Sequence, residues 1–181
     1  MNTAVTTTPA HSVRRLDRID AAQLAALADV LVDCVAGGAS VGFMHPFGAA
    51  QALAFWRRIA EGVERGERAL LIGEDAHGIV GTVQLVLDQM PNQPHRADLA
   101  KMLVHRRGRR QGWGAALMSA AERVARDAGR TLLVLDTAND EAARLYARLG
   151  WREVGVIPNY ALYPDGAPCA TTYFYRELTP A

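Results

Sequence analysis

The sequence is poor in the features that mark secreted, membrane and metal-binding proteins. It has only two cysteines in 181 residues, Cys34 and Cys169, and neither a Cys-x-x-Cys motif nor a zinc-site spacing. No apolar run approaches the ~20 residues of a membrane helix, and residues 1–10 lack the basic start and apolar core of a secretory signal. We therefore expect a cytoplasmic protein with reduced thiols, no metal and no membrane partner.

The sequence also lacks an excess of charge of either sign. A net charge of +1 gives no general attraction to nucleic acid or to an acidic membrane, so any basic site must be local. The length suits one domain with a real core. We expect residues 1–10 to form a flexible tail and residues 11–181 to form a single domain.

The spacing of apolar residues changes period along the chain, which predicts alternating strands and helices. Strands are expected at 11–16, 69–73, 79–87, 97–104, 131–136, 151–157 and 171–177, and helices at 20–36, 49–65, 112–128 and 139–149. The early strands form antiparallel pairs, a strand–helix–strand unit gives a parallel crossover, and Pro164-Asp165-Gly166 closes a final hairpin. The predicted fold class is α/β, a mixed sheet with helices on both faces.

A basic, glycine-rich turn joins the strand that ends at Val104 to the following helix. Gly112 and Gly114 carry no Cβ, so their backbone can approach a bound group closely. The first N–H groups of the helix have no intrahelical partner, and together with the helix dipole they favour phosphate. The spacing is neither that of a P-loop nor that of a dinucleotide-binding motif. A solvated turn that merely caps the helix is the alternative.

Two motifs resemble those of a known family. The segment from Arg109 to Gly114 matches Gln/Arg-x-x-Gly-x-Gly/Ala, the pyrophosphate loop of the GNAT superfamily of acyl-CoA N-acyltransferases. The run from Asn139 to Trp151 resembles the second GNAT signature, and it departs from it only by the extra Asp140 and by Trp151 in place of Phe or Tyr. The predicted order of strands and helices also resembles the GNAT fold.

A closer resemblance is to the tabtoxin-resistance acetyltransferases within the superfamily. It rests on the segments 37–44, 135–137, Tyr160 and 164–166. It implies direct attack of a primary amine on acetyl-CoA, with a small amino-acid-like, toxin-like or antibiotic-like acceptor. The residues that it places on acetyl-CoA are Met102, Leu103, Val104, Arg109, Arg110, Gln111, Gly112, Trp113, Gly114, Ala115 and Asn139.

Three residues are predicted to be catalytic. The resemblance makes Tyr146 the general acid, and a phenol with a pKa near ~10 stays protonated at neutral pH until the thiolate leaves. Asp136 and Asp98 are the candidate bases, although the relatives carry a glutamate where this chain has Asp98. The alternatives are a packing aromatic for Tyr146, a turn or helix cap for Asp136, and an edge-strand charge for Asp98.

The acceptor amine is expected to lie against the loop at residues 37–47 and Tyr160. The residues that the resemblance places there are Phe43, His45 and Tyr160, and plain packing is their alternative. His45 is the second choice for the base, and His105 is expected to be solvated or beside the phosphates.

Two other functions stay open from the sequence. One is a protein or peptide N-acetyltransferase, because acceptor specificity depends on loop geometry. The other is a nucleotide-binding or nucleic-acid-binding module that uses Lys101, Arg106, Arg107, Arg109 and Arg110 against phosphates. The sequence does not distinguish a monomer from a homodimer.

Overall fold

The structure is a computed structural model that describes residues 11–179, so the predicted tail at 1–10 lies outside the described residues. The elements follow in the order β1 (Ser12–Leu16), α1 (Ala21–Ala36), α2 (Ala49–Glu64), β2 (Arg68–Asp75), β3 (Gly78–Val86), β4 (Arg96–Val104), a 3-10 turn (Arg106–Gly108), α3 (Trp113–Asp127), β5 (Leu132–Thr137), α4 (Asp140–Arg148), β6 (Arg152–Leu162) and β7 (Pro168–Glu177).

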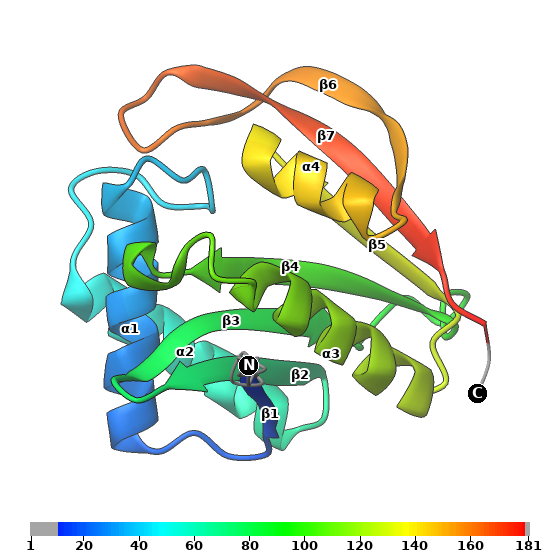
Figure 1. Ribbon diagram of the computed structural model, residues 1–181, viewed down its shortest axis with the longest axis horizontal. Helices are drawn as coiled ribbons and strands as arrows, with labels where there is room; N and C mark the ends of the chain where they lie inside the picture. Colours follow the sequence, from blue (N-terminus) through cyan, green and yellow to red (C-terminus); the bar gives the residue numbers. More distant parts are fainter. Residues whose placement is uncertain (1–10, 180–181) are drawn as a thin grey trace, which may run out of the picture.

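The strands form one mixed sheet in the order β1-β2-β3-β4-β5-β7-β6 (Figure 1). Neighbouring strands are antiparallel except β4 and β5, which are parallel. The predicted fold class is therefore confirmed, with antiparallel strands first, a parallel crossover through α3, and a closing hairpin of β6 and β7.

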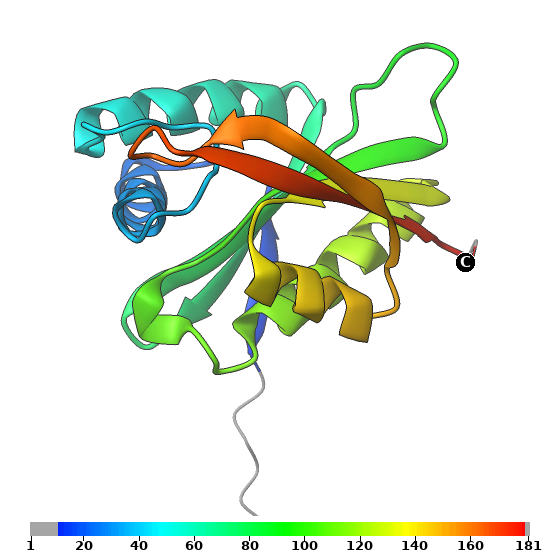
Figure 2. The ribbon, with the colours of Figure 1, turned by 90° about the horizontal axis from the view of Figure 1, so that it is seen from above.

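The helices cover both faces of the sheet, as predicted. Figure 2 shows α1 and α2 on one side and α3 and α4 on the other. The first pair buries Leu27, Leu31 and Trp56 against the sheet, and the second pair buries Leu117 and Tyr146. Among the described residues, no helix is both long and apolar enough to cross a membrane.

β4 and β5 pair only where they begin. Arg96, Ala97 and Asp98 lie opposite Leu132, Leu133 and Val134, and no further pairs of these two strands are found within residues 11–179. In Figure 1 the two strands start side by side and then separate, β4 staying with β3 and β5 with β7. The edge of β4 beyond Asp98 therefore has no strand partner on the β5 side in the described chain.

Local sequence explains where two of the helices begin. The Asp20 carboxylate accepts a hydrogen bond from the Gln23 N–H, and the Gln23 side chain accepts one from the Asp20 N–H, so α1 starts with a complete capping box. The Asn139 side chain accepts from the Ala142 N–H at 2.8 Å and starts α4 in the same way.

Strands β2 and β6 end beyond their predicted positions, and β7 begins at Pro168 and not at residue 171. β2 continues to Asp75, so its turn is shorter than the predicted 74–78 turn. β6 continues to Leu162, because an irregularity in its pairing between Ile157 and Ala161 absorbs Pro158 and Asn159. Tyr160 consequently lies within a strand.

A buried carboxylate joins α3 to the closing hairpin. Glu122, which is 7% exposed, accepts a hydrogen bond from Trp151 Nε1 at 3.1 Å. The Arg176 Nε atom lies 3.1 Å from the same oxygen as an ion pair, and an Arg126 nitrogen lies 3.7 Å from the other oxygen. Because Trp151 precedes β6 and Arg176 lies in β7, this cluster holds the hairpin against α3.

We predict that Glu122→Gln lowers the free energy of unfolding by about 1–3 kcal/mol, because the amide leaves the partly buried guanidinium of Arg176 without a counter-charge. Urea denaturation followed by circular dichroism measures the change. Glu153→Gln, on the exposed strand β6, is the control. Equal midpoints for the two variants would show that the cluster adds no net stability.

Candidate active site

Strand β4 contains a bulge beside the point where it leaves β5. Thr82 lies opposite Leu103 and Gln84 lies opposite Ala100, so β4 has one more residue than β3 over this interval. Lys101 takes up the irregularity with a φ of 49°, which is unusual for a residue other than glycine. The bulge re-aims the side chains of β4 at the place where its backbone edge is unpaired.

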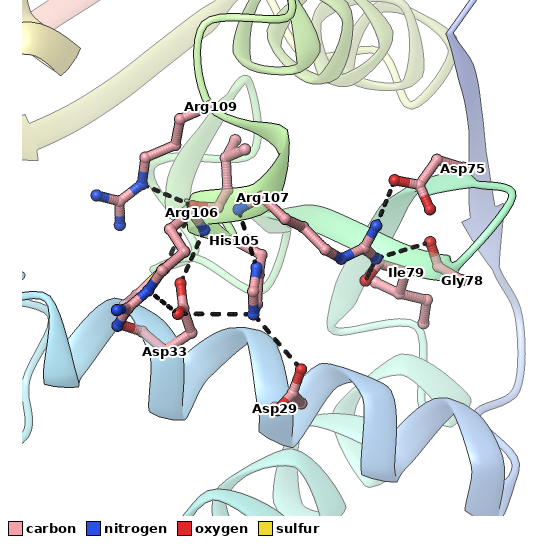
Figure 3. A network of polar contacts seen from close by, with 11 residues as sticks. Asp29, Asp33, Asp75, Gly78, Ile79, His105, Arg106, Arg107 and Arg109 are labelled. Atoms are coloured by element: carbon pink, nitrogen blue, oxygen red, sulfur yellow. Dashed lines mark hydrogen bonds and ion pairs between the residues drawn. The ribbon is translucent and has the colours of Figure 1, made fainter.

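Ion pairs fix the basic turn that follows β4 (Figure 3). Asp33 of α1, whose side chain is 9% exposed, accepts a hydrogen bond from the Arg106 N–H at 2.8 Å and pairs with the Arg106 guanidinium. Arg107 pairs with Asp75 and donates to the Ile79 carbonyl at 2.9 Å. These two arginines therefore hold the turn in place.

The expectation for His105 is wrong, because this side chain faces α1. Its Nδ1 accepts from the Arg107 N–H at 3.1 Å, and its Nε2 lies 3.5 Å from Asp33 and 3.6 Å from Asp29 (Figure 3). The side chain is only 17% exposed. His105 thus supports the turn from inside.

The remaining polar residues of the turn surround the start of α3. Arg109 Nε donates to the Val104 carbonyl at 3.2 Å, and the Gln111 amide donates to the Arg107 carbonyl at 2.8 Å. Arg110 is exposed and pairs with Glu141 of α4 at 3.1 Å. The carbonyl of Val104, a predicted cofactor contact, is thus already occupied by a side chain.

The start of α3 has the properties of an anion site. Gly112 is the N-cap with a φ of 88°, and it offers no side chain to the helix amides. The first hydrogen bond along the helix runs from the Ala116 N–H to the Gly112 carbonyl, so the N–H groups of Trp113, Gly114 and Ala115 have no partner within the helix. These donors and the nearby arginines fit a pyrophosphate.

Two residues of the motif have packing roles that differ from the expectation. A Cβ on Gly114 would lie 2.8 Å from the Leu145 side chain, so this glycine lets α4 approach α3. The Trp113 ring is buried, and a Cβ on Gly73 would lie 2.7 Å from it. Only the backbone of Trp113 and Gly114 is free to meet a ligand.

Asp136 lies at the end of β5, where this strand has left β4. It is exposed, and it accepts a hydrogen bond from the Thr171 hydroxyl at 2.8 Å. Its negative charge contributes to raising the pKa of Tyr146 and of Tyr173, and it opposes the lowering of the pKa of Lys101. Asp136 is therefore the carboxylate around which the other candidate residues gather.

Asp98 lies on the paired part of β4, opposite Val134. It forms an ion pair with Arg96 at 3.0 Å and accepts from the Gln89 amide at 3.2 Å. These contacts occupy one carboxylate oxygen of Asp98. Of the two predicted bases, Asp136 is the more available.

Tyr146 projects from α4 into the core between α4 and the sheet. It is 4% exposed, and its ring lies 5.8 Å from that of Phe174 and 6.1 Å from that of Trp151. No hydrogen bond of its hydroxyl is found among residues 11–179. Burial, and then the charge of Asp136, raise the pKa of Tyr146 far above its ordinary value.

The predicted substrate residues lie on the α1–α2 side of the sheet. Phe43 packs on Phe47 and Phe55, with ring centroids 4.5 and 5.3 Å apart. The His45 N–H donates to the Pro164 carbonyl at 2.9 Å, and the Tyr160 hydroxyl lies 2.8 Å from that of Tyr173. The loop at 37–47 therefore meets the closing hairpin.

Sequence reasoning missed two residues of this region. Tyr173 lies opposite Asp136 in the pairing of β5 with β7, and the hydrogen bond with Tyr160 raises its pKa to about 12, with burial and Asp136 contributing. Lys101, named only among the cations of the nucleotide-binding or nucleic-acid-binding alternative, lies on the α2 side, beside Phe55. The pairing of β5 with β7 would have indicated Tyr173. Lys101 could have been singled out because the chain has no other lysine.

No group of three or more metal-ligating side chains is found within residues 11–179. Asn139, predicted to contact the cofactor, uses its Oδ1 as the cap of α4, which leaves its NH₂ group as the donor for a ligand.

Comparisons with known proteins agree on one fold. The model of the Acetyltransferase (GNAT) family matches residues 36–151. A GNAT superfamily phosphinothricin acetyltransferase from Sinorhizobium meliloti, in complex with acetyl-CoA, is 17% identical with a TM-score of 0.76, covering 94% of this chain and 93% of that one.

Two further solved structures are similar. A ribosomal-protein-alanine N-acetyltransferase from Brucella melitensis is 18% identical with a TM-score of 0.75, over 92% of this chain and 99% of that one. An N-acetyltransferase from Staphylococcus aureus Mu50 is 15% identical with a TM-score of 0.77, over 93% and 99%. At these identities the likeness shows the fold. The closer resemblance to the tabtoxin-resistance enzymes stays a prediction.

We predict that Arg110→Gln weakens acetyl-CoA binding by about 3- to 10-fold, because it removes a charge from the predicted pyrophosphate site. Isothermal titration calorimetry measures the dissociation constant. Arg123→Gln makes the same charge change at an exposed position of α3 and is the control. Equal losses in both variants would indicate a general charge effect, and no loss in Arg110→Gln would remove this residue from the site.

Proposed function

Because the chain belongs to the GNAT family of acetyltransferases, we propose that it transfers the acetyl group of acetyl-CoA to a primary amine. The proposed acceptor is a small amino-acid-like, toxin-like or antibiotic-like molecule. One observation supports this most directly: Asp136 lies at the end of β5, where this strand no longer pairs with β4, and its charge contributes to the raised pKa of Tyr146. A proton acceptor thus adjoins an unpaired backbone edge, and its charge acts on a proton donor.

The described residues fit acetyl-CoA. The start of α3 suits the pyrophosphate, with Arg109, Arg110 and Gln111 beside the free helix amides. The pantetheine arm carries amide groups, and the edge of β4 at Met102 and Leu103, which β5 leaves unpaired, offers backbone donors and acceptors to match them. Bound acetyl-CoA would supply the activated thioester.

Asp136 is the proposed base. An alkyl amine is mostly ammonium at neutral pH, and it must lose a proton before it attacks the thioester carbonyl. The Asp136 carboxylate is exposed, and one of its oxygens accepts from Thr171, which leaves the other free to take that proton, directly or through water. Asp98 is the proposed second carboxylate, less available because Arg96 neutralises it.

Tyr146 is the proposed acid. A CoA thiolate, like a cysteine thiolate with an ordinary pKa of about 8.5, is a weaker base than a tyrosinate of raised pKa. The phenol therefore stays protonated and stabilises the departing sulfur mainly through the hydrogen bond that it donates.

Direct attack, without an acetylated enzyme, is favoured by the state of the two cysteines. Both thiols are free and buried. Burial raises the pKa of Cys34, and Cys169 lies 3.4 Å from the Ser40 hydroxyl. Neither thiol is exposed, as a nucleophile must be. Free thiols also agree with the proposed cytoplasmic location.

Acetylation of a protein or peptide is the second candidate, and one similar structure carries such a name. The α1–α2 loop and the closing hairpin contact each other through Ser40 Oγ and the Leu162 carbonyl, 2.8 Å apart. Because this contact encloses the acceptor side, it favours a small acceptor. Binding of nucleic acid is less well supported, because Arg106 and Arg107 are held by Asp33 and Asp75.

We predict that Tyr146→Phe lowers kcat by about 10²-fold, because the ring remains but the hydrogen bond to the leaving sulfur is lost. Acetyl-CoA affinity should change little. Release of the thiol, followed with a disulfide reagent, measures the rate. An unchanged kcat, with the chemical step shown to limit turnover, would remove Tyr146 from the mechanism.

We predict that Asp136→Asn lowers kcat/KM by about 10²-fold at pH 7, and that the deficit shrinks toward pH 10. Without its base the enzyme depends on amine that is already deprotonated, and that fraction grows as the pH approaches ~10. Asp98→Asn should have a smaller effect, and Asp127→Asn, which makes the same change at an exposed position at the end of α3, is the control. A deficit that stays constant from pH 7 to pH 10 would show that Asp136 is not the base.

A further inference from the structure

Lys101 is the single lysine among the 20 lysine and arginine residues of the chain. Every other cationic position is an arginine, including the whole basic turn after β4. The lysine lies at the bulge of β4, with a φ of 49°, at the level where β4 has already left β5. A position that keeps the less common cation beside a candidate active site points to a specific use of its ammonium group.

The Lys101 ammonium lies on the acceptor side of the sheet. Its Nζ is 5.7 Å from the centre of the Phe55 ring, and a Cβ on Gly42 would be 3.9 Å from it. Burial lowers the pKa of Lys101, the charge of Asp136 partly offsets this, and Arg68 lowers it further. The ammonium thus lies beside α2 and the α1–α2 loop, and the charge of the proposed base acts on it.

The surroundings of this ammonium are rich in donors. Within residues 11–179 no carboxylate lies within 4 Å of Lys101 Nζ, and no side chain forms a hydrogen bond with it. Arg68 donates to the Gln84 carbonyl oxygen at 3.3 Å, and the Gln84 NH₂ group is buried without a partner. Two donors without acceptors, the Lys101 ammonium and the Gln84 NH₂ group, suit an anion.

We propose that Lys101 binds a carboxylate or similar oxyanion of the acceptor while the acceptor's amine faces Asp136. The inference rests on the proposed function and narrows its substrate class to amines that also carry an anionic group, such as amino acids. Lysine suits this place because its ammonium is a compact charge on a thin stem, whereas a guanidinium needs a planar, bidentate partner. Amines without an anion, such as diamines, would meet an uncompensated charge there.

The first test compares acids with their methyl esters. A panel of amino acids and the matching methyl esters is assayed with the wild-type enzyme, Lys101→Met and Lys101→Arg. We expect the wild-type kcat/KM to be about 10- to 100-fold higher for the acid than for its methyl ester. Lys101→Met should bring this acid-to-ester ratio near one, through a higher KM for the acid. Lys101→Arg should keep part of the preference. An acid-to-ester ratio that Lys101→Met leaves unchanged would overturn the proposal.

The second test does not depend on turnover. Reductive methylation with ¹³C-formaldehyde keeps the charge of an amine, and here it labels only one lysine besides the N-terminus. We expect the Lys101 methyl signal, assigned by its absence in Lys101→Arg, to shift with N-acetyl amino acids and not with their methyl esters. Failure of turnover together with this shift would reject the proposed function alone.

The absence of a shift would reject the anion site. Intact mass after incubation with acetyl-CoA completes the design, because it shows whether the lysine itself is acetylated. Stoichiometric acetylation of Lys101 would make it an acceptor, and that result would also overturn the proposal.

Discussion

The structure depends on the separation of β4 from β5 after three paired residues. A strand edge without partners is costly in a folded protein unless its N–H and C=O groups find others. The bulge at Lys101 lies in the part of β4 that β5 no longer pairs, and the first turn of α3 follows the end of that strand. A ligand that combines a phosphate with peptide-like amides can pair with the N–H and C=O groups of this edge more specifically than water does.

Opposite charges on neighbouring elements hold the basic turn after β4 in place. The turn after β4 carries four arginines in a chain of net charge +1, and the cost of gathering them is offset by acids from α1 and β2. Arg106 and Arg107 thus neutralise Asp33 and Asp75, which leaves Arg109 and Arg110 as the cations nearest the anion site. One basic segment thus supplies both the ion pairs that fix the turn and the cations that attract a ligand.

The sequence predicted the order of the elements well, because periodicity and the caps at Asp20 and Asn139 are local signals. It failed where the deciding partner is distant. Arg106 meets Asp33 across 73 residues, and nothing near Arg106 indicates that contact. Gly114 was expected to admit a ligand, and its missing Cβ also makes room for Leu145 of another helix, which no signal near Gly114 indicates. Tyr160 was expected near a loop, whereas an irregular strand carries it.

In the proposed mechanism, Asp136 couples proton removal from the amine to the hydrogen bond that Tyr146 donates to the leaving sulfur. Its negative charge is one of the two causes that raise the pKa of Tyr146, burial being the larger. When the carboxylate takes a proton from the attacking amine, that charge disappears and the pKa of Tyr146 must fall. The phenol therefore becomes a stronger hydrogen-bond donor at the stage when negative charge develops on the departing sulfur. In this proposal one carboxylate, Asp136 at the end of β5, accepts the proton of the amine and thereby strengthens the hydrogen bond that the Tyr146 phenol donates.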